Sequence, residues 1–268
     1  MKLLNKILLI ILEVWIILAV IFGIYDLEIS KVIVDTHSPI GLVGTIIGYY
    51  VRDSLIIIII TILGGSFFHK NVQREIGFFL LAISVLILIY NILKPDGSLI
   101  FSFILIGFVL GFIILTYNTD WKNFVQIAII VLLLYISFKV ILDLTKLIFG
   151  RVRFKHLDSN YSNYTQWYII NGVESDNQSF PSGHSMYSWL FLPFLILLRR
   201  ENLNKYIKII VASSVIGYGF FISIARVLIG GHYCSDVLFS TCIACTLCIL
   251  FYKKISNIER LKILEAWP

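Results

Sequence analysis

Long apolar runs that contain few charges recur along this chain, and they constrain its fold more than any other feature. Of its 268 residues, 59% are hydrophobic and only 14% are charged, whereas ordinary globular domains carry about 25% charged residues. A helix that crosses a bilayer needs about 20 apolar residues, and several runs approach or reach that length. The composition therefore excludes a soluble globular protein and predicts an all-α, polytopic bundle of membrane helices.

We expect about eight spans, organised as one integral-membrane domain over residues 1–268. The first apolar run is too long for a signal segment and is expected to stay in the protein. Residues 26–53 are too polar to cross and are expected to lie along the surface as a short amphipathic helix that ends near Ser38-Pro39. The expected spans are centred on residues 7–25, 54–69, 76–93, 99–117, 124–145, 185–199, 206–228 and 234–252.

The lysine and arginine residues of alternate loops indicate how the chain is oriented, because cytoplasmic loops carry an excess of them. Three polar blocks, described below, are set aside in this comparison. One side of the membrane then has only Lys31, Arg52 and Lys94, whereas the side that holds both termini is rich in lysine and arginine. Both termini are therefore expected to be cytoplasmic. The net charge of +6 follows largely from this bias, and no basic stripe interleaved with aromatic residues predicts a nucleic-acid partner. The richer side holds Lys2, Lys6, Lys70, Arg74, Lys122, Arg199, Arg200, Lys205, Lys208, Lys253, Lys254, Arg260 and Lys262.

The three polar blocks interrupt the second half of the chain. Ionisable groups are costly at membrane depth, so their presence there indicates a functional site. With eight spans, all three blocks fall on the same, extracytoplasmic face. The blocks are Lys146 with Arg153, then Pro181-Ser182-Gly183-His184, then Arg226 with His232 and Asp236.

The third block contains a histidine and a carboxylate at helical spacing. His232 and Asp236 are four residues apart, so on a helix they share a face. A carboxylate there can accept the imidazole N–H and leave the other ring nitrogen as a nucleophile or a base. The pair on its own is also compatible with a purely structural role.

The other two blocks contain groups that bind anions. Pro181-Ser182-Gly183 fits the start of a helix that begins near His184, where exposed backbone N–H groups attract anions. Lys146, Arg153 and Arg226 supply positive charge for phosphate oxygens. Taken alone, such basic residues could equally extend to lipid headgroups at the end of a span.

In order and spacing, the three blocks resemble the signature of the type 2 phosphatidic acid phosphatase (PAP2) superfamily, K-x6-R-P, P-S-G-H and S-R-x5-H-x3-D. Two positions depart from it, because Phe154 replaces the proline and Ala225 replaces the serine. The motif-bearing core covers about residues 124–252. Since the core of this family is usually described as six spans, an extra hairpin is expected at about residues 74–119.

The resemblance implies a lipid phosphatase of the plasma membrane that needs no metal or other cofactor. His232 would attack phosphorus to form a phosphohistidine, Asp236 would orient its ring, and His184 would protonate the leaving alkoxide. Substrates in the family include phosphatidic acid, phosphatidylglycerophosphate, isoprenyl pyrophosphates and lipid A phosphates. The phosphate oxygens would be held by Lys146, Arg153, Ser182, Gly183 and Arg226.

Two other functions stay open at this point, a lipid phosphotransferase and a non-catalytic membrane protein with a relict site. The oligomeric state is also open. Arg151 and Lys155 match no position of the signature and are left unassigned. Four cysteines in or next to the last apolar run are expected to be packing thiols and not metal ligands: Cys234, Cys242, Cys245 and Cys248.

Overall fold

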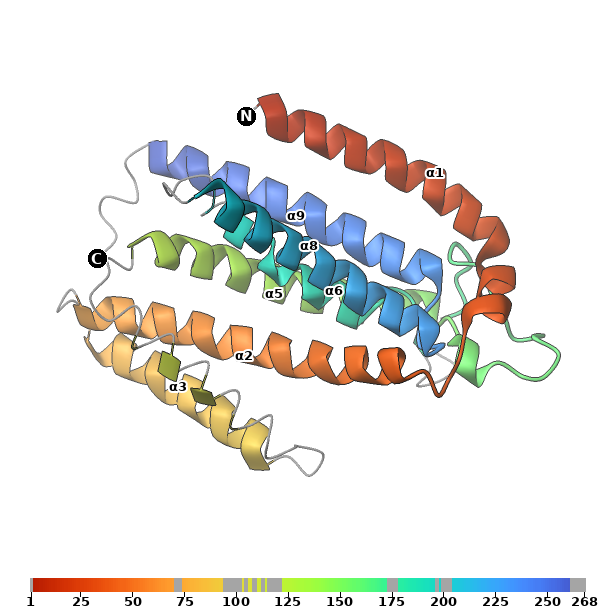
Figure 1. Cartoon of the computed structure of the whole chain (residues 1–268), viewed down its shortest axis with the longest axis horizontal. Coiled ribbons are helices and arrows are strands. Elements are labelled where there is room, and N and C mark those ends of the chain that lie inside the picture. Colours follow the sequence, from red (N-terminus) through yellow and green to blue (C-terminus); the bar gives the residue numbers. More distant parts are fainter. Residues whose placement is uncertain are drawn as a thin grey trace. The chain divides into compact units, whose positions relative to one another are not determined.

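The computed structural model of the chain describes residues 2–69, 74–93, 122–172, 178–195 and 204–260, with residue 198 and a few separate positions between 103 and 114. In the described residues the chain is all-helical, as expected (Figure 1). Two short 3-10 helices are η1 (Phe154–His156) and η2 (Trp189–Phe191). The α-helices described are α1 (Lys2–Ile33), α2 (Pro39–His69), α3 (Arg74–Leu93), α5 (Lys122–Phe149), α6 (Gly183–Ser188), α8 (Lys205–Leu228) and α9 (Cys234–Arg260).

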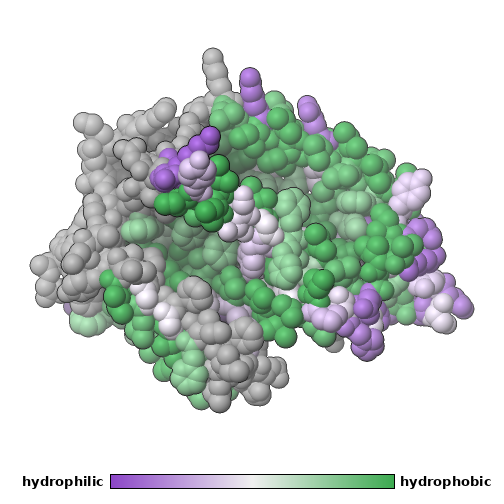
Figure 2. Space-filling model, in the orientation of Figure 1, coloured by the Kyte–Doolittle hydropathy of each residue, from purple (hydrophilic) through white to green (hydrophobic). Residues whose placement is uncertain are grey.

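Five of the described helices, α1, α2, α5, α8 and α9, are long and apolar enough to cross a membrane. The chain is therefore an integral, multi-pass membrane protein, but the expected count of about eight spans is wrong. Helix α3 contains only a shorter apolar stretch, and the expected span at 99–117 lies mostly outside the described residues. In Figure 2, apolar side chains cover most of the visible described surface, which suits contact with lipid.

In its described residues, the expected span at 185–199 begins with two short elements and not with one long helix. Helix α6 has only six residues and is followed directly by η2. From Trp189 onward, backbone hydrogen bonds join residues three positions apart, as in a 3-10 helix. The N–H of Leu192 donates to the carbonyl of Trp189, and the N–H of Leu195 donates to the carbonyl of Leu192. Pro193 has no N–H to continue an α-helix. Apolar composition alone did not reveal this break.

The expected surface helix within residues 26–53 was also wrong. Helix α1 continues past Asp26 to Ile33, and α2 already begins at Pro39. Proline suits the first position of a helix, where its missing N–H has no partner to lose. The hydroxyl of Ser38 accepts a hydrogen bond from the N–H of Gly41 (3.3 Å), as an N-cap does. Ser38-Pro39 therefore starts a long helix, whereas the sequence interpretation placed a helix end there.

The described chain divides into two compact units. The first comprises Met1–Gly48 and Leu134–Lys253, and the second comprises Tyr49–Leu133 and Lys254–Pro268. All three polar blocks belong to the first unit. In the second unit, Ile57 is buried against Ile58, Ile87 and Leu88. The single domain and the extra hairpin at about 74–119 stay predictions.

Small residues allow the start of α2 to pack closely against α8 within the first unit. A β-carbon at Gly44 would collide with Ala225, and one at Gly48 would lie 3.2 Å from the ring of His184. Such close approach through glycine is common between membrane helices. The guanidinium of Arg226 donates to the hydroxyl of Thr45 at 2.6 Å, on the same stretch of α2. This packing places groups of the second and third polar blocks beside one helix.

Candidate active site

The three polar blocks lie where helices of the first unit end or begin. Lys146 is in the last turn of α5, His184 is in the first turn of α6, and Arg226 is in the last turn of α8. The charges of Arg153 and Arg226 act both on the ammonium of Lys146 and on the imidazole of His232. The structure therefore brings the first and third blocks into one region.

His232 lies in the turn between α8 and α9, two residues before α9 begins at Cys234. Gly230 has a positive φ of 68°, a conformation that favours glycine. A β-carbon at Gly231 would collide with the guanidinium of Arg226. The N–H of His232 donates to the carbonyl of Arg226 at 3.2 Å, and the side chain of His232 is almost fully buried. The glycine turn thus packs the histidine directly onto the arginine.

The ring of His232 is oriented by Ser179, which the sequence interpretation did not identify. Its Nδ1 lies 2.7 Å from the backbone carbonyl of Ser179. Because a carbonyl can only accept, Nδ1 carries the hydrogen and Nε2 keeps its lone pair. Asp236 lies 3.6 Å from the same Nδ1, which is beyond a short hydrogen bond. The two residues do not share one helical face, because His232 precedes α9, so Asp236 acts on the ring mainly through its charge.

His232 is neutral at ordinary pH. Burial lowers its pKa to about 4, because the imidazolium form loses its solvation in the protein interior. The charges of Arg226 and Arg153 lower the pKa further, and Asp236 opposes them. A neutral imidazole with a free Nε2 lone pair has the form that a nucleophile requires.

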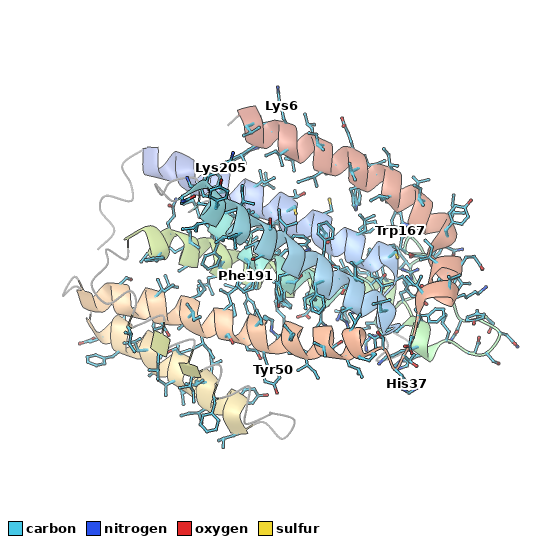
Figure 3. All side chains as sticks on the ribbon, in the orientation of Figure 1. Lys6, His37, Tyr50, Trp167, Phe191 and Lys205 are labelled. Carbon is cyan, nitrogen blue, oxygen red and sulfur yellow. The ribbon has the colours of Figure 1, made fainter. Side chains whose placement is uncertain are left out.

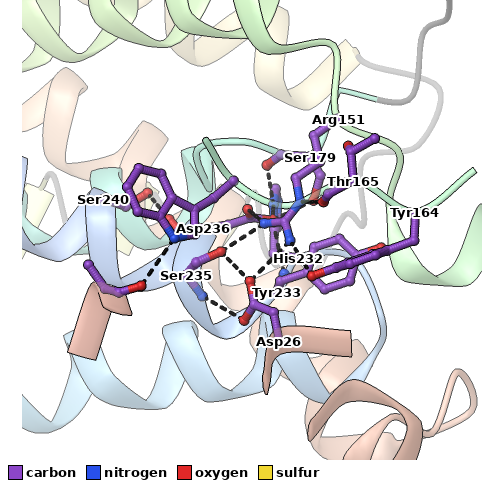
Figure 4. A network of polar contacts seen from close by, with 12 residues as sticks. Asp26, Arg151, Tyr164, Thr165, Ser179, His232, Tyr233, Ser235, Asp236 and Ser240 are labelled. Carbon is purple, nitrogen blue, oxygen red and sulfur yellow. Dashed lines mark hydrogen bonds and ion pairs between the residues drawn. The ribbon is translucent and has the colours of Figure 1, made fainter. Parts of the chain in front are cut away.

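Asp236 is completely buried in the first turn of α9, and both of its oxygens are occupied (Figure 4). One oxygen accepts the backbone N–H of Tyr233 at 2.9 Å and a short hydrogen bond from the hydroxyl of Ser179. The other oxygen accepts from the guanidinium of Arg151 at 2.7 Å. Ser179 therefore contacts Asp236 through its hydroxyl and His232 through its carbonyl.

Arg151, which the motif spacing left unassigned, is the most connected of these buried groups (Figure 4). Only 1% of it is exposed, and it also binds Asp26 of α1 at 3.0 Å. Its remaining N–H groups donate to the hydroxyl of Ser235 (2.7 Å) and the carbonyl of Thr165 (2.8 Å). The carboxylate of Asp26 in turn accepts the N–H of Ser235 at 3.0 Å. This cluster of Asp26, Arg151 and Asp236, called the buried triad below, joins α1 to the start of α9.

Ser182 caps α6, which begins at Gly183, close to the helix start that the sequence predicted near His184. Its hydroxyl accepts from the N–H of Ser185, and its own N–H donates to the carbonyl of Asp236 at 3.2 Å. Its carbonyl accepts from the hydroxyl of Ser240 at 2.8 Å. The second block is therefore attached to the backbone of α9 beside Asp236.

Arg153 brings a buried hydrogen-bond donor to the candidate site. The Nε atom of Arg153 is buried and has no hydrogen-bond partner among the described residues. A buried donor without an acceptor destabilises the folded protein, so this Nε favours the binding of a group that can accept its hydrogen bond. In the described part of the chain, no three His, Cys, Asp or Glu side chains are grouped to hold a metal ion. The arrangement is suited to binding an oxyanion.

Both departures from the signature have defined surroundings. Phe154 begins η1, and its ring stacks on Tyr161 at 6.0 Å and meets Tyr233 edge-on at 6.3 Å between centroids. Ala225 is fully buried and lies against Gly44. Phe154 thus packs on the ring that covers Arg151, since Tyr233 lies 3.9 Å from that guanidinium.

We predict that Arg151→Met destabilises the protein by about 3–5 kcal/mol, because it leaves two buried carboxylates without their cation. Unfolding of the detergent-solubilised chain would be followed by heat or denaturant. Lys31→Met is the matched control, since its ammonium pairs with Glu28 at 2.7 Å in the last turn of α1, where both side chains are exposed, and such pairs contribute about 1 kcal/mol or less. Equal effects of the two substitutions would contradict the role of the buried triad.

A second prediction concerns pH. The pKa of His232 is about 4 in the folded chain and about 6.5 when unfolded, so the unfolded form takes up a proton between these values. The contribution of the buried, neutral His232 to the free energy of unfolding is therefore complete above pH 6.5 and is lost as the pH falls towards 4. Between pH 7 and 5 the loss from this group is about 2 kcal/mol. His232→Gln should lose that much less stability over the same interval, and identical losses in both proteins would refute the burial argument.

The comparison with protein families agrees with the order and spacing of the three polar blocks. No curated protein and no solved structure matches the chain. The family model described as the PAP2 superfamily matches residues 124–260, which is more than half of the chain and includes all three polar blocks. The chain therefore belongs to the PAP2 superfamily.

Proposed function

We propose that the protein is a membrane phosphatase that hydrolyses a lipid phosphate or lipid pyrophosphate through a phosphohistidine on His232. Members of the PAP2 superfamily are typically metal-independent phosphatases. The observation that carries the proposal is the state of His232, whose Nδ1 is bound to the carbonyl of Ser179 and whose pKa is about 4. The charges of Arg153 and Arg226 act on the same ring.

In the first step, Nε2 of His232 attacks phosphorus and the bond to the leaving oxygen breaks. His184, in its protonated form, donates a proton to the departing alkoxide. The imidazole becomes positively charged, and the carboxylate of Asp236 at 3.6 Å stabilises that charge. The phosphoryl oxygens are held by Lys146, Arg153, Arg226 and the backbone of Ser182-Gly183.

In the second step, the phosphohistidine is hydrolysed. His184, now neutral, accepts a proton from a water molecule whose oxygen attacks phosphorus. The bond between phosphorus and Nε2 breaks, inorganic phosphate leaves, and His232 returns to its neutral form. Arg151 and Asp26 act through Asp236, because they hold its carboxylate in place during both steps.

The orientation of the site in the membrane is part of the proposal. In the first unit, the side chain of Lys253 near the end of α9 donates to the side chain of Asn5 near the start of α1. The start of α1 and the end of α9 therefore lie together. Figure 3 shows Lys6 and Lys205 towards that end and Trp167 and His37 towards the opposite end. Because lysine-rich ends are usually cytoplasmic, the site end is assigned to the extracytoplasmic face of the cell membrane. This assignment does not depend on the number of spans.

The activity is tested with the purified full chain in detergent. The substrates are phosphatidic acid, phosphatidylglycerophosphate, isoprenyl monophosphate and diphosphate, and lipid A phosphates, each with and without chelator. We expect at least one of them to release inorganic phosphate equally in both conditions. His232→Ala should reduce kcat by about a thousandfold or more, as expected for loss of a nucleophile.

The matched control for that experiment is His37→Ala. His37 is exposed in the link between α1 and α2 and takes part in no proposed step, so this variant should keep wild-type activity. A phosphate label that is stable to alkali and labile to acid should form on the wild type and be absent from His232→Ala. Transfer of phosphate to an added alcohol in place of water would identify a phosphotransferase. Absence of turnover on every substrate would leave the non-catalytic alternative.

Sidedness is tested by labelling intact cells with a membrane-impermeant maleimide. Ser159→Cys places a thiol in the exposed loop after η1, and Lys205→Cys places one at the exposed start of α8. Relative to the wild-type chain with its four native cysteines, we expect Ser159→Cys to react in intact cells. Lys205→Cys should react only after lysis. The reverse pattern would put the site on the cytoplasmic face.

A further inference from the structure

The guanidinium of Arg151 is bound by two carboxylates that lie far apart in the chain. Asp236 accepts from it at 2.7 Å and Asp26 at 3.0 Å. Within the described residues, the other groups that contact this guanidinium are neutral: the carbonyl of Thr165, the hydroxyls of Ser235 and Tyr164, and the ring of Tyr233. Among these contacts, only Asp26 and Asp236 can balance the charge of Arg151.

The contacts of Asp26 indicate that it is ionised, although its side chain is completely buried. One oxygen accepts the backbone N–H of Ser235 at 3.0 Å, and the other accepts from the guanidinium of Arg151 and from the hydroxyl of Ser235. That hydroxyl itself accepts from Arg151 at 2.7 Å, so its hydrogen is directed at Asp26. Every described contact of the carboxylate is thus with a donor, and a protonated oxygen would have no acceptor.

The buried triad therefore carries one excess negative charge, because two carboxylates surround one guanidinium. Asp236 brings this charge to within 3.6 Å of Nδ1 of His232. The charges of Arg153 and Arg226 act on the same ring in the opposite sense. If Asp26 were neutral, Arg151 would cancel the charge of Asp236, and these two arginines would be unopposed.

We propose that Asp26 is a positioning residue of the reaction, which neutralises Arg151 and so leaves the charge of Asp236 available to stabilise a phosphohistidine on His232. This inference rests on the proposed phosphatase function. Asp26 acts through Arg151 and Asp236, not by contact with the reacting atoms. Helix α1 lies outside residues 124–260, which match the family model, so the proposal adds a residue from outside that match to the active site.

The step that depends on Asp26 is the formation of the phosphohistidine. Nε2 of His232 gives its electron pair to phosphorus, the bond from phosphorus to the leaving oxygen breaks, and that oxygen takes a proton from His184. Nδ1 keeps its hydrogen, so the ring gains one positive charge. The excess negative charge of the triad stabilises this charge in the transition state, but it does not assist the binding of an anionic substrate. Loss of the charge should therefore lower kcat without raising KM.

Asp26→Asn tests this role, because the amide keeps the size of the side chain and an oxygen that accepts hydrogen bonds but removes the charge. Rates of the full chain in detergent are measured with dioctanoyl phosphatidic acid and with farnesyl diphosphate, and are expressed per folded protein. We expect kcat to fall about tenfold, as for the loss of one buried charge that acts on the ring. Glu28→Gln is the matched control, because it removes the same charge from an exposed position of α1 and should leave kcat unchanged.

A double variant separates the charge of Asp26 from its packing. Asp26→Asn combined with Arg151→Gln removes one charge of each sign, so the excess negative charge returns, and the glutamine amide can still donate to Asp236. We expect kcat to recover at least about threefold relative to Asp26→Asn alone. A purely structural role predicts a double variant that is no faster than Asp26→Asn, and that result would overturn the inference.

Asp26→Glu decides the question if the double variant does not fold, because it keeps the charge and changes the length of the side chain. A kcat within about threefold of the wild type would support the role of the charge. A loss as large as that of Asp26→Asn would contradict it.

The remaining outcomes separate this inference from the proposed function. An Asp26→Asn variant with wild-type kcat would overturn the inference and leave the phosphatase function intact. A raised KM with unchanged kcat would overturn it as well, because Asp26 would then act on substrate binding. A wild type that hydrolyses neither probe, nor any other lipid of the panel, would remove the proposed function and with it the step that depends on Asp26.

Discussion

The ion pairs of Arg151 with Asp26 and Asp236 are the contacts on which the rest of the site depends. Moving one unpaired charge into a protein interior costs several kcal/mol, and here three charges are almost completely buried. They are tolerated because each has several partners, including Ser235 and the ring of Tyr233 for the guanidinium. The family match begins at residue 124, so α1 lies outside it. Helix α1 nevertheless supplies Asp26, one of the two acids of the triad.

Ser179 transmits this arrangement to the histidine. Its hydroxyl binds the carboxylate of Asp236, and its carbonyl binds Nδ1 of His232. The acid therefore influences His232 in two ways, by its charge at 3.6 Å and by holding the residue that orients the ring. The same carboxylate is held by Arg151, so its position is set before any substrate binds. A displacement of α1 would reach His232 through this chain of contacts.

The sequence predicted the all-helical membrane fold, because apolar composition is a local property of the chain. That the polar blocks share one face was inferred from the alternation of eight spans and from the family resemblance, and the span count was wrong. The sequence did not predict where apolar runs break. Helix α6 ends at Ser188 within one expected span, and Ser38-Pro39 begins a helix where an end was expected. Asp26, Arg151 and Ser179 were missed because their partners are far away in sequence, 125 residues in the case of Asp26 and Arg151. For Asp26, the sequence signal was the presence of an acidic residue near the end of the first apolar run.

The distribution of charge explains how one site can favour opposite states of His232 at different stages. In the free protein, burial and the charges of Arg153 and Arg226 keep the imidazole neutral, against the effect of Asp236. A bound phosphate brings negative charge to these arginines and offsets their effect on the ring. The carboxylate of Asp236 would then become the dominant charge near Nδ1, which would favour the positively charged ring of the proposed phosphohistidine. In the proposed mechanism, substrate binding itself would therefore convert a site that protects a neutral nucleophile into one that stabilises the intermediate.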